Sequence, residues 1–400
     1  MNQKKLKLLI SIVGLLFSTN VIANSTNIDD YIYNTDNETG ITCKNLWIFD
    51  RVHNLEAYYE FPFVEDVNAR TATIDYNRGK IYISNSKQVY TYEGDDATTK
   101  YVAHLIILDL HTGRFEKELP LTCDGIAITG LLCANQVGTD DAGNVWICGY
   151  TKDISTNPTK LYMVKNFDTG ECEAVADLSL PSNESASSGR IDCWDVFGDI
   201  TGETSGAVCM AATSSSDKCY LYRWELAKGA SKWIANSTWG TISKEITETY
   251  PSGQATWGTG ATLNIINDEF FYVDGFYTYP TLYNTSLKIV ESFASATNLA
   301  PDKGCNGIDE FTIKENKYIA YAETQYIITP GCRVNICQLG ENRSFEGMRH
   351  LWSVPETGLG NVSDAGTRIH SIDTYKVSDK NGKEGVYLLT YKVLIGKSLK

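Results

Sequence analysis

The chain has 400 residues, of which 42% are hydrophobic, and its formal net charge is −14 at pH 7. Such a length is ample for one large core. An acidic chain without a basic cluster is a poor partner for nucleic acids or for anionic membrane surfaces, and both are excluded as expected ligands.

Residues 1–23 have the pattern of a secretory signal. Three lysines precede the apolar run Leu8–Phe17, and Val21–Ala23 offers residues small enough for cleavage. The apolar run is too short to span a bilayer comfortably, so we expect no membrane span after cleavage. Cleavage leaves 32 basic and 49 acidic residues, a net charge of −17. We expect a protein that is secreted, periplasmic or held at the cell surface.

Residues 24–42 are polar and rich in Asn and Asp, which predicts a flexible leader. The next stretch, Asn45–Phe63, matches the second half of a repeating unit that fills most of the chain. Its turn ends at Asn54, and asparagine is, after glycine, the residue that best tolerates the left-handed backbone conformation. No first half precedes this stretch.

The first complete unit is Ala69–Leu121, which reads as two successive β-hairpins. In the first, Arg70–Tyr76 pairs with Lys80–Asn85 across a turn that contains Gly79. In the second, His104–Asp109 pairs with Phe115–Leu121, and Gly113 stands where the turn needs a positive φ. The unit therefore has four antiparallel strands.

Both halves of this unit recur along the chain. The second strand of the first hairpin is repeated at Gly79–Ser84, Asn144–Cys148, Gly206–Ala211, Glu269–Asp274, Asn316–Ala322 and Gly385–Tyr391. The five-residue turn of the second hairpin is repeated at Asp109–Gly113, Asn166–Gly170, Glu225–Gly229 and Gln338–Asn342. A recurring four-strand unit without helical periodicity is typical of a β-propeller.

The two ends of the repeat array complement each other. Thr367–Val393 is a sixth first half with little chain after it, and Asn45–Phe63 is a second half with nothing before it. Pairing them in one sheet would hide two sheet edges. The sequence thus predicts an all-β, six-bladed β-propeller over residues 43–400, a single domain closed by pairing N-terminal strands with the C-terminal blade. A seven-bladed propeller is the alternative.

A ligand site is expected at one mouth of the central channel, where the loops lead into the innermost strands. The side chains placed there are polar or aromatic, and the candidates for ligand binding are Arg70, Asp192, Trp194, Trp257, Asp309, Arg368 and His370. Aromatic faces beside amides and carboxylates suit a sugar ring, whereas two arginines suit a carboxylate or phosphate. The competing interpretation is structural, with Asp192, Arg190 and Arg368 forming contacts between blades.

Catalytic chemistry is less well supported. His370 is the only histidine on the expected mouth, and the general-base role would need an orienting partner such as Asp364 or Asp373 and a nucleophile that the sequence does not indicate. We therefore assign no catalytic residue. A metal-dependent hydrolase of lactonase type is the enzymatic alternative. Calcium would be its ion, held by oxygens from Asn135, Asp192, Asn306 and Asp309. No cofactor is otherwise expected, and no metal residue is assigned.

Eleven cysteines in an exported chain predict disulfides, with at least one thiol left over. Two local pairs are the candidates: Cys123 with Cys133, and Cys332 with Cys337. Cys148 and Cys209 lie in apolar strands and read as small core residues. The spacings match no zinc site.

Three runs carry a resemblance to a known group of proteins. NARTATIDYNRGKIYISN, HLIILDLHTGRFEKELPL and VGTDDAGNVWICGY look like uncharacterised secreted β-propeller proteins of the Bacteroidetes type. They are more loosely similar to the YncE-like and quinoprotein-like propellers. The resemblance spans about residues 45–400 and lies in the blade pattern. It implies an extracytoplasmic scaffold involved in adhesion or glycan handling, and it transfers no catalytic residue.

The sequence therefore favours a secreted or periplasmic, non-enzymatic propeller of the bacterial cell envelope. It would bind a glycan, a peptide or a protein partner at the channel mouth. The alternatives are the metal-dependent hydrolase and a structural adhesin that uses the outer blade surfaces. These three differ in their response to metal, to small ligands and to substitutions at the mouth.

Overall fold

The structure is a computed structural model, and it describes residues 11–18, 35–49, 68–93, 96–154, 156–179, 190–214, 219–236, 241–242, 262–275, 278–292, 307–323, 332–359 and 367–394. Within these ranges the regular structure is β-strand, apart from one short 3₁₀ turn, η3 (Glu341–Arg343). The described part of the chain contains no helix long and apolar enough to cross a membrane.

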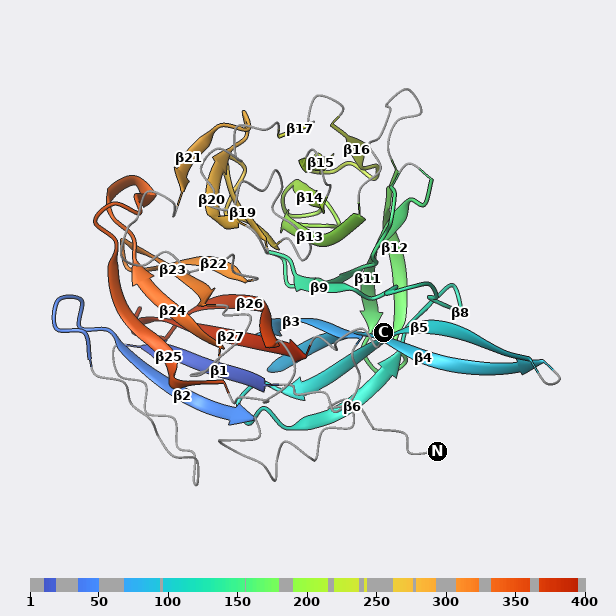
Figure 1. Ribbon diagram of the computed structural model, residues 1–400, viewed down its shortest axis with the longest axis horizontal. Helices are drawn as coiled ribbons and strands as arrows, with labels where there is room; N and C mark the ends of the chain where they lie inside the picture. Colours follow the sequence, from blue (N-terminus) through green and yellow to red (C-terminus); the bar gives the residue numbers. More distant parts are fainter. Residues whose placement is uncertain are drawn as a thin grey trace.

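The strands form sheets of four or more strands, and one strand of each sheet lies nearest the centre (Figure 1). One sheet contains β3 (Ala69–Asp75), β4 (Lys80–Glu93), β5 (Asp96–Asp109) and β6 (Phe115–Pro120). The next contains β9 (Gln136–Thr139), β10 (Val145–Cys148), β11 (Thr159–Asn166), β12 (Glu171–Leu178), β7 (Thr122–Cys123) and β8 (Ile126–Ala127). A third contains β13 (Arg190–Gly198), β14 (Ala207–Ser214), β15 (Cys219–Leu226), β16 (Ile234–Ala235) and β17 (Thr241–Ile242).

The remaining described strands form three further sheets of four strands each. The first has β18 (Thr262–Ile265), β19 (Phe270–Gly275), β20 (Thr278–Asn284) and β21 (Ile289–Ser292). The second has β22 (Ile308–Ile313), β23 (Asn316–Glu323), β24 (Cys332–Gln338) and β25 (Arg349–Leu359). The last has, in spatial order, β26 (Thr367–Ser378), β27 (Glu384–Leu394), β1 (Ser11–Ser18) and β2 (Thr42–Phe49).

The sheets stand around a common centre, and their innermost strands form a closed circuit (Figure 1). The strands β3, β9, β13, β18, β22 and β26 contact one another in that order, and β26 contacts β3 again. Radial sheets around a central channel define a β-propeller. The predicted all-β propeller class is therefore confirmed.

The predicted hairpins of the first unit are confirmed in register. Ile74 pairs with Ile81 in the first hairpin, and His104 pairs with Pro120 in the second. Gly113 has a φ of +66°, in agreement with the positive φ that the turn requires. The hairpin of β4 and β5 extends past the predicted end at Asn85, because its strands continue to pair out to Glu93 and Asp96.

The expected pairing of the chain ends needs a correction. β2, which contains the start of the predicted segment Asn45–Phe63, does share a sheet with β26 and β27. However, it does not pair with β27. The strand between them is β1, which pairs with β27 from Ser11 to Ser18 without a break. Residues 50–67, including the predicted turn at Asn54, lie outside the described residues.

β1 comes from the segment predicted to be a secretory signal. Its sequence, SIVGLLFS, is rich in residues that favour strands, and apolar runs of this length suit a strand as well as a signal. In the structure this run is therefore a strand of the sheet that also contains β2, β26 and β27. Its removal after Ala23 stays a prediction.

β2 is also held by contacts outside its own sheet. Trp47 is buried and its indole Nε1 donates to the carbonyl oxygen of Leu110, 3.0 Å away, in the adjacent sheet. Before the strand, the Arg349 guanidinium binds both carboxylate oxygens of Asp36, with Nη2 2.9 Å from Oδ2. This pairing holds the pKa of Asp36 well below its usual range. Trp47 in β2 and Asp36 before it therefore bind residues of the two neighbouring sheets.

The structure shows neither of the predicted disulfides. Cys123 and Cys133 are free thiols, and the Cys133 Sγ is turned toward the carbonyl oxygens of Tyr101 and Ile128. Cys337 is likewise a free, buried thiol. Cys332 and Cys337 are five residues apart on one strand, β24. Their backbone positions are therefore separated by about 16 Å, beyond the reach of a disulfide.

Candidate functional site

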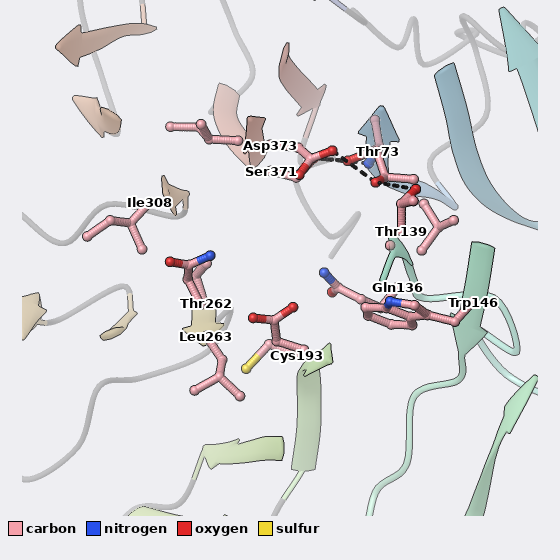
Figure 2. Close-up of a pocket in the computed structure, with 16 residues that line it drawn as sticks. Thr73, Gln136, Thr139, Trp146, Cys193, Thr262, Leu263, Ile308, Ser371 and Asp373 are labelled. Carbon is pink, nitrogen blue, oxygen red and sulfur yellow. Dashed lines mark hydrogen bonds between the residues drawn. The ribbon is translucent and has the colours of Figure 1, made fainter. Parts of the chain in front are cut away.

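The central channel contains a polar cavity of about 80 Å³. Every innermost strand contributes to its wall (Figure 2). The lining side chains that carry polar groups are Thr73, Gln136, Thr139, Trp146, Cys193, Asp195, Thr262, Asn264, Ser371 and Asp373. The cavity is about half the size of the ~150 Å³ cavity that accommodates benzene. It has room for a few water molecules or a small ion, but not for a sugar ring.

Asp373 of β26 joins its strand to β3. Its Oδ2 accepts hydrogen bonds from the backbone N–H of Ile74, at 2.6 Å, and from the hydroxyl of Thr73, at 2.9 Å (Figure 2). On the same two strands, the backbone N–H of Ala72 donates to the hydroxyl of Ser371. Side chains from one innermost strand thus satisfy backbone groups of the next, which an edge strand would otherwise leave open.

The same arrangement is repeated around the ring. Asp195 of β13 accepts a hydrogen bond from the backbone N–H of Ile265 in β18, at 2.5 Å. Asn264 of β18 donates to Asp309 of β22, at 3.1 Å, and Asp309 also accepts from Thr374 of β26. Asp195, Asp309 and Asp373 therefore each join one innermost strand to another.

The pKa values of three acids on the innermost strands are raised. Burial, opposed by the hydrogen bond from Ile265 and reinforced by the charge of Asp373, raises the pKa of Asp195 to about 7. Burial raises the pKa of Asp373 to about 6. Burial and the nearby charge of Asp373 also raise the pKa of Asp309 well above its usual range. The charges of these carboxyls raise one another's pKa values, so the ionisation of one opposes that of the others.

Trp146 brings an unsatisfied donor to the cavity. Its side chain is 2% exposed, and its indole N–H has no hydrogen-bond partner among the described residues. The indole lies against Gly138 of β9, where any Cβ would overlap the ring, and it forms the cavity wall beside Gln136 (Figure 2). Because an unpaired buried donor is energetically costly, we expect the indole N–H to bind an acceptor in the cavity, such as water or a ligand oxygen.

The structure places most of the predicted ligand-binding residues on innermost strands. Arg70 lies half-buried in β3, and Asp309 lies buried in β22. Asp192 belongs to β13, and Arg368 and His370 belong to β26, but their side chains lie outside the described residues. Trp257 lies outside them entirely. The assignment of innermost strands from the sequence was therefore correct for these positions.

None of the predicted ligand-binding residues that the structure describes is among those that line the cavity, and Trp194 points away from it. It is fully buried between sheets, its Nε1 donates to the carbonyl oxygen of Gly149 at 2.9 Å, and its ring packs on Trp224. Strand alternation explains the difference, because the neighbour Asp195 points to the channel and Trp194 therefore points into the core. Trp194 is a core residue here and is not available to a ligand.

Sequence reasoning therefore missed residues that line the cavity, Asp195 and Trp146 among them, and named Asp373 only as a possible orienting partner for His370. The two acids lie on strands that carry several other polar or charged residues, so the sequence does not single them out. Nor does any signal mark Trp146, which stands on the second strand of its sheet and reaches the channel only over a glycine. In the described part of the chain, no group of three acidic, histidine or cysteine side chains is arranged to hold a metal ion.

Comparison with known proteins finds neighbours only among solved structures. The chain matches no protein-family model and no curated protein. Among solved structures, 80 chains match. They include an ulvan lyase of polysaccharide lyase family PL25 bound to -[GlcA(1-4)Rha3S]-, with 11% identity, a TM-score of 0.37, and coverage of 81% of this chain and 78% of the lyase. They also include prolyl oligopeptidase B from Galerina marginata, with 10% identity, a TM-score of 0.33, and coverage of 80% and 38%. At such low similarity the activities of these proteins do not transfer to this chain.

Proposed function

We propose that this protein is an extracytoplasmic, non-enzymatic β-propeller that binds a glycan, a peptide or a protein partner across the mouth of its central channel. The observation that supports this is the convergence of all innermost strands on one polar cavity that is too small for the ligand itself. A ligand larger than a few water molecules therefore has to lie over the mouth. Arg70 of β3 is a half-buried cation on an innermost strand and is the described residue best suited to meet it.

The same proposal includes the blade count. We count each sheet with an innermost strand in the closed circuit as one blade, which makes six, with seven as the alternative. The support is that the circuit of β3, β9, β13, β18, β22 and β26 returns to its start. The blade that contains both chain ends would then close the ring.

The chief alternative is a hydrolase. Asp195 lines the cavity with a pKa of about 7, and a carboxyl that titrates near the working pH is a candidate for acid–base catalysis. Against this role, its Oδ2 is occupied by the backbone N–H of Ile265. A metal-dependent variant with calcium in the channel is the form of this alternative that the sequence proposed. An adhesin that uses its outer surfaces is the other alternative.

Thermal melting of the purified protein distinguishes these functions. Glycans and peptides are added one class at a time, and separate samples receive Ca²⁺ or EDTA. A ligand at 100 times its dissociation constant stabilises the folded state by about 2.7 kcal/mol, which is a shift of a few degrees. We expect such a shift with a glycan or peptide and no response to Ca²⁺ or EDTA.

The matched variants are Arg70→Ala at the mouth and Arg114→Ala, an exposed arginine at the turn before the outer strand β6. The ligand-induced shift is expected to disappear with the first and to persist with the second. A melting temperature that follows Ca²⁺ and EDTA would favour the hydrolase. Binding that survives Arg70→Ala but is lost on substitution of outer residues would favour the adhesin.

A further inference from the structure

We propose that Cys123 and Cys172 form a disulfide bond in the exported protein. Cys123 ends β7, and Cys172 is the second residue of β12. The two strands pair in parallel, and in that register Cys172 is the direct partner of Cys123. The structure shows both as free thiols, which is the reduced form.

The register places the two cysteines within disulfide range. Neighbouring strands lie about 4.8 Å apart, and side chains of directly paired residues in a parallel ladder project to the same face. Disulfides form between Cα atoms about 4.4–6.8 Å apart. The two residues therefore need no rearrangement of the sheet to be joined.

The other thiols nearby are less suited to this bond. Cys123, Cys133, Cys148 and Cys172 are all close enough to the Tyr162 hydroxyl to raise its pKa by their charges, after the larger effect of burial. Cys133, Cys148 and Cys172 are all buried, and the Sγ atom of each is turned toward a backbone carbonyl oxygen, so the strand register is what distinguishes them. Neither Cys133 nor Cys148 is a strand partner of another cysteine in the described ladders. Cys123 and Cys172 are the pair that a ladder aligns.

The bond would stabilise the connection between two neighbouring sheets. β6 ends at Pro120 in one sheet, and two residues later the chain enters β7, which lies between β12 and β8 in the next sheet. β7 is a two-residue strand, held to the start of β12 by a bond from the Thr122 N–H to the Gly170 carbonyl oxygen at 3.0 Å and by one from its hydroxyl to Glu171. A covalent link at Cys123 would fasten this short strand, and with it the two sheets, to each other.

The oxidation is a thiol–disulfide exchange, and it rests on the proposed export. The two thiols lose two protons and two electrons as the S–S bond forms, and the electrons reduce the disulfide of an oxidising carrier to two thiols. Cys123 is the partly exposed member and would first form the mixed disulfide with the carrier. Cys172 then displaces the carrier thiol. Burial raises the pKa of Cys172 to about 12, so we expect this second step to occur during folding, before Cys172 is enclosed.

The experiment is a peptide map of the purified full chain under non-reducing conditions. One sample is refolded with oxidised glutathione and the other with excess reductant, and free thiols are alkylated after unfolding. We expect a linked pair of peptides that contains Cys123 and Cys172, about 2 Da lighter than the sum of the reduced peptides. Reduction of the oxidised protein is expected to lower the melting temperature by about 3–8 °C, because the bond closes a loop of roughly 50 residues.

Cys123→Ser and Cys172→Ala should each abolish the linked peptides and the effect of reductant, whereas Cys133→Ser should leave both unchanged. Linked peptides that join Cys123 to Cys133 or to Cys148, or full alkylation of Cys123 and Cys172 in the oxidised sample, would overturn the proposal. The same map of protein recovered from outside the cytoplasm tests the compartment separately. A bond that forms in vitro but is missing there would contradict the proposed export and leave the geometry supported.

Discussion

Asp195→Asn is expected to raise the melting temperature by about 3–5 °C at pH 8 and to leave it unchanged at pH 4. In the folded protein the pKa of Asp195 is about 7, whereas an unfolded aspartate has a pKa of about 3.9. The folded state therefore binds this proton more tightly than the unfolded state does, and ionisation of Asp195 destabilises the fold as pH rises from about 4 to about 7. Asparagine removes that loss and can still accept the N–H of Ile265 through its Oδ1. The difference between the folded and unfolded pKa corresponds to a change in the free energy of unfolding on the order of 4 kcal/mol, from which the temperature change follows.

A second channel variant and a surface control accompany this measurement. Asp373→Asn should act in the same direction with a smaller effect, because the pKa of Asp373 is raised only to about 6. Asp168→Asn is the control, since this acid has a side chain that is 91% exposed and pairs with Lys117 at the surface. Melting is followed by circular dichroism from pH 4 to pH 8. A melting temperature that falls at pH 8 in Asp195→Asn, or a pH profile equal to that of the wild type, would show that the channel carboxyls are not strained by burial.

Gly170→Ala is expected to be the most damaging of the conservative substitutions in the turns. Gly170 closes the turn between β11 and β12 with a φ of +77°, and an added Cβ would overlap the backbone carbonyl oxygen of Pro120 in the adjacent sheet. Backbone cannot move aside as a flexible side chain does. We expect a melting temperature at least about 5 °C below that of the wild type, or loss of soluble protein.

Gly229→Ala is the matched control for this substitution. Gly229 ends the equivalent turn of the next sheet with a φ of +73°, and no atom of the described residues lies within 4 Å of the position that an added Cβ would take. Gly229→Ala is therefore destabilised only by the left-handed backbone conformation. This lowers the free energy of unfolding by about 1–2 kcal/mol and the melting temperature by roughly 1–3 °C. Equal losses in the two variants would mean that β6 and the turn at Gly170 are not packed as the structure shows.

The candidate site could be predicted only in part from the sequence. Repeat spacing located the innermost strands well enough to put Arg70, Asp309 and the backbone positions of Arg368 and His370 on them. It did not reveal which face of each strand meets the channel. A shift by one residue exchanges the two faces, and this is why the sequence favours Trp194 as a ligand residue although Asp195 is the one that lines the channel.

The sequence by itself determined the strands and turns of the repeating unit and the propeller class, because these depend on local properties. Alternating apolar residues define a strand, and Gly113, Gly170 and Gly229 recur where a turn requires a positive φ. Asn342, at the weakest copy of the turn, also adopts the left-handed conformation, with a φ of 55°. Local chemistry of this kind can be recognised without knowing what lies next to it.

Only the tertiary structure decided which strand completes the sheet of the chain ends, which cysteines face each other, and which acids share the channel. β1 lies between β2 and β27, Cys123 is aligned with Cys172, and Asp195, Asp309 and Asp373 interact across three sheets. Each of these is a contact between segments far apart in the chain. Their partners are set by the closure of the ring and by the register of neighbouring strands, and no property of either segment alone specifies them.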